Sequence, residues 1–231
     1  MVRLVGTGVL GLDILLGGGM IGGSTAVIIG PVDVVKAHIA QQYILEGLKA
    51  NECCLYVSSL DVKEKVKEQF KYRFKFDIEP LMDNGVFELL EVEISDDSNL
   101  KINKVGDSFE SLRSTITKIS DCNKCRIVIN NLLHFFYLTD DSTKIVQGLA
   151  WLDAFRQRRG AESVLLYVMD TGGISKVYEE VVKSLCDYVF EVERAENVVG
   201  KLKVLKAPTL HSVEWHELFF TENGVELAVV T

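Results

Sequence analysis

Residues 24–39 read STAVIIGPVDVVKAHI, and this stretch decides how the rest of the chain is interpreted. The mostly apolar run 24–29 predicts a short buried strand, and a helical pattern of apolar residues extends over 36–50. A glycine after a buried strand, a short loop and a lysine that opens a helix form the layout of a phosphate-binding loop, G-x-x-x-x-G-K-[ST]. Gly30 and Lys36 stand at the spacing that this pattern requires.

Other positions of the loop lack the residue types that bind a nucleotide. Val35 stands in place of the second glycine, and a β-branched residue poorly adopts the backbone conformations that turn N–H groups toward phosphate. Ala37 replaces the hydroxyl that binds Mg²⁺, and Asp33 adds a negative charge. We therefore expect the loop to differ from a phosphate cradle, with its own side chains filling part of the phosphate position.

A glycine-rich segment precedes the strand. It reads TGVLGLD over residues 7–13 and LGGGMIGGS over residues 16–24. This segment resembles the TGxxGLDxLLGGGxxxGS stretch of the RecA/KaiC family of P-loop ATPases. The resemblance implies a RecA-like three-layer α/β fold, with a mainly parallel central sheet, helices on both faces and an antiparallel C-terminal extension. It also implies ATP as the family ligand and side-by-side assembly of subunits.

The pattern of the remaining chain agrees with that fold class. Strands are predicted over 24–29, 54–59, 86–93, 126–130 and 163–169, with helices over 36–50, 61–74, 107–120, 142–158 and 174–185. Strands that alternate with helices predict a parallel sheet. Consecutive strands over 186–194, 199–206, 212–220 and 225–230 predict an antiparallel edge. We expect a single domain over 1–231, with a lead-in over 1–23 and a strand-rich C-terminal edge over 186–231.

Composition narrows the class of protein. A formal net charge of −8 argues against a dedicated nucleic-acid binder, which needs a basic surface. No apolar run reaches the length of a membrane span and no signal peptide is recognised, so we expect a cytoplasmic location. Cys122 and Cys125 form a C-x-x-C without a second ligand pair, so incidental placement is favoured over a metal or redox role. We expect reduced thiols throughout.

The resemblance also places the other parts of an ATPase site. Asn130 ends the strand 126–130, where the family carries a Walker B aspartate for the Mg²⁺ shell. Leu60 and Asp61 stand where KaiC-like ATPases have adjacent glutamates, and Asp61 is instead expected to cap the helix after it. Lys206 matches the lysine of a Lys-Met-Arg segment that reaches the neighbouring subunit, but the arginine is missing.

Three further features stay open at this stage. Lys36 either keeps a weak affinity for anions or is a solvated lysine in the first turn of a helix. Asp170 either contributes to a ligand site at the end of its strand or belongs to a turn that starts the next helix. The aromatic run 135–137 either lies buried beneath the long helix or forms part of an interface.

The combined losses predict a chain that does not hydrolyse ATP efficiently and that needs no cofactor. We expect it to act as an interaction, assembly or regulatory subunit, either as a homo-oligomer or with a related RecA-like subunit. One alternative is an ATP-binding protein with slow or unconventional hydrolysis. Another is a recombinase-like paralogue that contacts DNA, which a salt-dependent gel-shift assay would detect.

Overall fold

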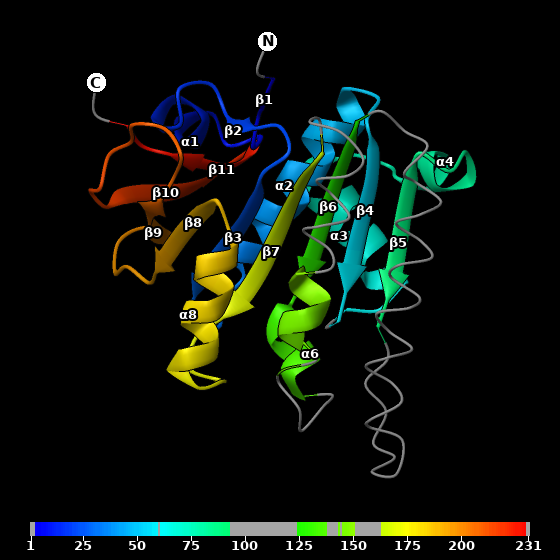
Figure 1. Ribbon diagram of the computed structural model, residues 1–231. Coiled ribbons are helices and arrows are strands. Elements are labelled where there is room, and N and C mark those ends of the chain that lie inside the picture. Colours follow the sequence, from blue (N-terminus) through cyan, green and yellow to red (C-terminus); the bar gives the residue numbers. More distant parts are fainter. Residues whose placement is uncertain are drawn as a thin grey trace.

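The computed structural model describes residues 3–59, 61–92, 124–137, 143, 145–150 and 163–229 (Figure 1). The strands are β1 (Leu4–Val5), β2 (Met20–Ile21), β3 (Thr25–Gly30), β4 (Cys53–Ser58), β5 (Phe87–Glu91), β6 (Cys125–Asn130), β7 (Val164–Asp170), β8 (Tyr188–Glu193), β9 (Gly200–Lys206), β10 (His216–Thr221) and β11 (Gly224–Leu227). The helices are α1 (Leu10–Leu15), α2 (Val35–Lys49), α3 (Lys63–Phe74), α4 (Glu79–Asp83), α6 (Leu132–Tyr137) and α8 (Lys176–Leu185).

The main sheet has nine strands in the order β11-β10-β9-β8-β3-β7-β6-β4-β5. The six strands from β8 to β5 are mutually parallel, and β9, β10 and β11 pair in antiparallel fashion at one edge. The predicted fold class is therefore confirmed. The prediction that residues 186–194 belong to the antiparallel edge is wrong. Strand β8 is parallel to β3, and the antiparallel part of the sheet begins only at β9.

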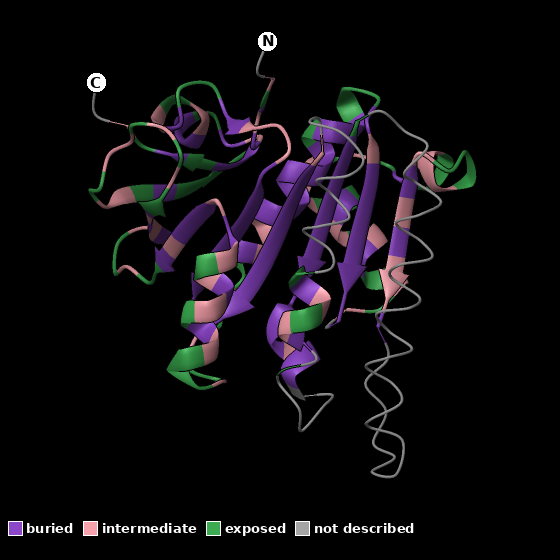
Figure 2. Ribbon diagram, in the orientation of Figure 1, coloured by how far each residue is buried: buried purple, intermediate pink, exposed green. Residues whose placement is uncertain are grey.

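Helices cover the two faces of the parallel strands (Figure 1). Side chains of α1, α2 and α3 share one hydrophobic core with one face of the sheet, whereas α6 and α8 share a second core with the other face. Strands β3, β6 and β7 are buried along their whole length, as expected for parallel strands covered on both sides. Strand β9 alternates between buried and more exposed residues, because only one of its faces is covered (Figure 2).

Most predicted elements lie within two or three residues of the observed ones. No helix was predicted directly after β6, but α6 forms there because Leu132, Phe135 and Phe136 turn one apolar face toward the sheet. The short helix α4 and the two-stranded ribbon of β1 and β2 were not predicted. The predicted helix 107–120 lies outside the described residues, as does part of the helix 142–158.

The glycine-rich segment before β3 docks the start of the chain against its end. Gly11 of α1 faces the backbone of β11, and a Cβ atom added to it would lie 2.0 Å from the carbonyl oxygen of Leu227. Asp13 accepts a hydrogen bond from the backbone N–H of Thr7 at 2.7 Å and so closes the loop ahead of α1. The glycine is therefore required by close approach of two elements that are far apart in the sequence.

We predict that Gly11→Ala lowers the free energy of unfolding by about 1–3 kcal/mol, because the added methyl group forces α1 away from β11. Leu10→Ala is the matched control in the same helix, since Leu10 is 71% exposed, and it should change stability by no more than about 0.5 kcal/mol. Urea denaturation of both variants measures the difference. Equal stability of Gly11→Ala and the unaltered protein would contradict the close approach.

Candidate functional site

The candidate site lies at the carboxyl end of β3, between β3 and β7. The chain leaves β3 through α2 on one face of the sheet and leaves β7 through α8 on the other face (Figure 1). Crossovers that diverge in this way open a crevice at the ends of the two strands, which is where open α/β sheets bind ligands. Residues 31–34 connect β3 to α2 at this point.

Lys36 lies in the first turn of α2 and its side chain is only 1% exposed. Its Nζ atom is 3.0 Å from Oδ1 of Asp170 and 3.5 Å from Oδ1 of Asp33, and it donates a hydrogen bond to the carbonyl oxygen of Pro31. The interpretation of Lys36 as a solvated surface lysine is therefore wrong. Burial of an ammonium group requires paired charge and hydrogen-bond acceptors, and the loop and β7 supply them.

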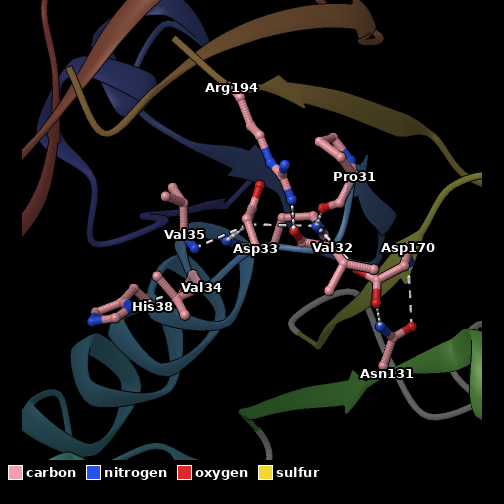
Figure 3. A network of polar contacts seen from close by, with 10 residues as sticks. Pro31, Val32, Asp33, Val34, Val35, His38, Asn131, Asp170 and Arg194 are labelled. Carbon is pink, nitrogen blue, oxygen red and sulfur yellow. Dashed lines mark hydrogen bonds and ion pairs between the residues drawn. The ribbon is translucent and has the colours of Figure 1, made fainter. Parts of the chain in front are cut away.

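Asp33 binds the amino end of α2 (Figure 3). Its Oδ1 atom accepts hydrogen bonds from the backbone N–H groups of Val35 at 3.0 Å and Lys36 at 3.3 Å. These are two of the N–H groups that a helix leaves without a partner inside the helix, and the Asp33 oxygen caps them from one residue before Val34, the N-cap residue of α2. Asp33 thus combines a helix cap with an ion pair to Lys36.

Asp170 reaches the site from the end of β7, and Asn131 holds it in place. The Nδ2 group of Asn131 donates to Oδ2 of Asp170 at 2.6 Å, and the backbone N–H of Asp170 donates to Oδ1 of Asn131 at 3.3 Å (Figure 3). Helix α8 begins only at Lys176, with Ser175 as its N-cap residue. The sequence is compatible with two roles for Asp170, and the structure places its carboxylate beside Lys36. Asn131 was not foreseen, although it directly follows Asn130.

Arg194 approaches the loop from the turn between β8 and β9. Its Nη2 group donates to the carbonyl oxygen of Val32 at 2.7 Å (Figure 3). Two cationic side chains, Lys36 and Arg194, and two carboxylates, Asp33 and Asp170, therefore surround the loop. Their formal charges sum to zero, so the loop carries no excess positive charge to attract a phosphate.

Gly30 ends β3 at the start of the loop. A Cβ atom added to it would lie 2.3 Å from the carbonyl oxygen of Val192 in β8. Close contact between neighbouring strands therefore requires a glycine here, independently of any ligand.

Asn130, at the position of a Walker B acid, binds a side chain of the neighbouring strand β4. It is buried, and its Nδ2 group donates to the hydroxyl oxygen of Tyr56 at 2.8 Å. Burial raises the pKa of Tyr56 to about 12, although its hydrogen bonds with Asn130 and Gln41 oppose that rise. The Asn130 amide is thus held by a neutral phenol inside the sheet–helix interface.

Asp61 belongs to a polar network on α3. It accepts a hydrogen bond from Gln69 at 2.9 Å and forms an ion pair with Lys65 at 2.5 Å. The expectation that Asp61 caps the following helix is wrong, because α3 begins at Lys63 with Val62 as its N-cap residue and without a side-chain cap. Instead, the backbone N–H of Lys63 donates to Oε2 of Glu91 at 3.2 Å.

Lys206 and the aromatic run also have partners within the chain. Lys206 donates to the carbonyl oxygens of Cys186 at 2.6 Å and Ser184 at 3.3 Å, near the end of α8, where a cation complements the helix dipole. Of the two alternatives for the run 135–137, burial is the one that holds for Phe135 and Phe136, which lie in a core with Ile145 and Leu149.

The cysteines depart from one expectation. Cys53 is disulfide-bonded, whereas Cys54, Cys125 and Cys186 are buried thiols outside any disulfide, so the expectation of uniformly reduced thiols is wrong for Cys53. Cys122 lies outside the described residues. Within the described part of the chain, no group of three or more His, Cys, Asp or Glu side chains is placed to hold a metal ion. No helix in the same part is both long and apolar enough to cross a membrane.

We predict that Lys36→Met lowers the free energy of unfolding by about 3 kcal/mol, because it leaves two largely buried carboxylates without their cation. Lys65→Met is the matched control: Lys65 also pairs with an aspartate, but its side chain is 61% exposed. Exposed pairs contribute little, so the control should lose at most about 1 kcal/mol. Urea denaturation compares the two, and equal losses would contradict the buried pairing of Lys36.

Comparison with known proteins gives a consistent result. Residues 5–227 match the family described as ATPase: KaiC. UPF0273 protein PH0284 of Pyrococcus horikoshii and UPF0273 protein PF1931 of Pyrococcus furiosus are each 20% identical to this chain, over 97% of it and 94% of their own length. The solved structure of KaiC-like protein PH0186 from Pyrococcus horikoshii aligns with a TM-score of 0.79 at 19% identity, over 99% of this chain and 100% of that one. The resemblance inferred from residues 7–24 is confirmed, and the chain belongs to the KaiC ATPase family.

Proposed function

We propose that this chain is a KaiC-family protein that does not hydrolyse ATP and that serves as an assembly or interaction subunit. The observation that carries the proposal is the pairing of Lys36 with Asp170 and Asp33. A phosphate-loop lysine acts by placing its charge on the phosphates of the nucleotide. Here two carboxylates already neutralise that charge, so an incoming triphosphate would have to displace both and would meet their repulsion.

The residues around the loop do not fit a Mg²⁺–nucleotide complex. Ala37 has no hydroxyl to bind the ion, and the amide of Asn130 is engaged by Tyr56. Asp170 has a carboxylate near the loop, but Lys36 and Asn131 already bind its two oxygens. Phosphoryl transfer depends on the positioning of the phosphates and on stabilisation of their charge, and the lysine, the Mg²⁺ ligands and the loop backbone supply these together. The proposed loss of activity therefore rests on all of these changes and not on one of them.

The C-terminal edge supports the role in assembly. Five exposed apolar side chains lie on β9, β10 and the segment between them: Leu205, Leu210, Val213, Phe219 and Phe220. The side chains of Phe220 and His38 lie in contact, with ring centroids 4.7 Å apart, so this edge adjoins α2 next to the candidate site. An exposed apolar surface on a soluble domain favours a protein contact. A second copy of this chain or a related RecA-like subunit would fit the family habit of side-by-side assembly.

A second candidate function is ATP binding with slow or unconventional hydrolysis. The membership of the chain in an ATPase family and the retention of Lys36 favour it. In that case the nucleotide would have to break the pairs of Lys36 with the two aspartates. Calorimetric titration with ATP and Mg²⁺ separates this candidate from the first, because only the second predicts a saturable heat of binding.

We predict that the purified protein shows no Mg²⁺-dependent ATP turnover above the background of Lys36→Met. The reason is that Ala37 has no hydroxyl to bind Mg²⁺ and that two carboxylates neutralise the charge of Lys36. Steady-state phosphate release, measured at protein concentrations high enough to permit assembly, tests this. Robust turnover that Lys36→Met abolishes would overturn the proposal.

We also predict a defined oligomer whose mass falls when the C-terminal edge is altered. Phe220→Glu places a charge on the exposed apolar surface and should shift the mass measured by light scattering toward that of one chain. Tyr72→Glu, at a residue of α3 that is 80% exposed, is the control and should leave the mass unchanged. A mass of 25.8 kDa for the unaltered protein at every concentration would contradict homo-oligomer formation.

A further inference from the structure

The position of the Asp33 carboxylate suggests a role beyond capping a helix. The amino end of an α-helix is an anion-binding site, because unpaired N–H groups point outward and the helix dipole favours negative charge. Oδ1 of Asp33 accepts from the N–H groups of Val35 and Lys36 and also lies 3.5 Å from Nζ of Lys36. One carboxylate oxygen thus meets the two kinds of donor, backbone N–H and lysine ammonium, that a phosphate-binding loop offers to a phosphate oxygen.

We propose that Asp33 is a tethered anion that occupies the phosphate position of the loop and keeps free phosphate groups out. This inference rests on the proposed function, because it gives the reason why the loop is closed to a nucleotide. A group attached to the loop competes at a high effective concentration with any free ligand. The Asp33 side chain is only 14% exposed, which fits a carboxylate enclosed by the loop.

The local charge balance indicates what removal of Asp33 would do. With Asp33 present, the charges of Lys36 and Arg194 are matched by those of Asp33 and Asp170. Without it, two cations would face one carboxylate, and two backbone N–H groups at the start of α2 would lose their acceptor. The loop would then carry one excess positive charge beside unpaired donors, which is the combination that binds a phosphate or pyrophosphate group.

The test is a titration of Asp33→Gly with inorganic pyrophosphate, at constant ionic strength set with chloride. Glycine is chosen because it replaces a capping residue with less loss of stability than alanine does. Removal of a unit charge about 4 Å from the ligand should lower the Kd for pyrophosphate on the order of tenfold or more. Isothermal titration calorimetry measures the affinity, and a rise in the Tm of the variant with pyrophosphate concentration gives an independent readout.

Two controls separate the gain in pyrophosphate affinity from the loss of a helix cap and from a nonspecific effect of net charge. Asp77→Gly removes a similar bond, since Oδ1 of Asp77 accepts from the N–H of Glu79 at 3.1 Å, and it should gain no affinity. The double variant Asp33→Gly with Lys36→Met should lose the gain. If Asp33→Gly does not fold, Asp33→Asn is titrated in its place; it keeps an acceptor oxygen and removes the charge, so a smaller gain of the same kind is expected.

The outcomes distinguish this inference from the proposed function. A gain in pyrophosphate affinity that is confined to variants of Asp33 and depends on Lys36 supports the tethered anion. No gain in either Asp33 variant, with an unaltered protein that neither binds nor hydrolyses ATP, overturns the tethered anion and leaves the proposed function standing. ATP hydrolysis by the unaltered protein in the same preparation overturns the proposed function itself.

Discussion

A lysine ammonium buried at the end of a parallel sheet imposes the constraint on which the candidate site depends. Lys36 lies at the start of α2, and its burial has to be balanced by negative charge because desolvation of a lone cation is costly. The balance comes from Asp33 in the same loop and from Asp170 on a strand far along the chain. The ion pairs join β3, α2 and β7, and Asn131 extends the network to the end of β6.

The same ends of the same strands would bind a nucleotide in an ATPase of this fold. Among the described residues, the side chains at the corresponding positions have partners from the chain itself. Asn130 donates to Tyr56, Asp61 binds Gln69 and Lys65, and Asp170 binds Lys36 and Asn131. These hydrogen bonds and ion pairs within the chain lower the cost of burying polar groups, and they leave fewer of those groups available to a ligand.

The opposite end of the sheet is stabilised by a separate buried network. Arg126, near the start of β6, donates to Oε2 of Glu52 at 2.6 Å and to the carbonyl oxygens of Gly6 at 2.6 Å and Tyr43 at 3.1 Å. Its guanidinium also lies 4.7 Å from the centroid of the Tyr43 ring. These contacts attach the glycine-rich lead-in to α2 and to the sheet. Gly6, directly before the segment that identifies the family, is thus held by a residue that is more than 100 positions away in the sequence.

The sequence by itself determined the fold class, because apolar periodicity and the glycine pattern of residues 7–24 are local signals. It also located the loop, with Gly30 and Lys36 at its two ends, and it showed which residue types the loop lacks. It did not reveal that α6 follows β6, that Asn130 binds Tyr56, or that Asp61 binds side chains of the helix after it. Each of these depends on which face a side chain presents to its neighbours. The partners of Lys36 were decided only by the tertiary structure, because parallel pairing of β3 and β7 brings Asp170, 134 positions further along the chain, to within 3.0 Å of its ammonium group.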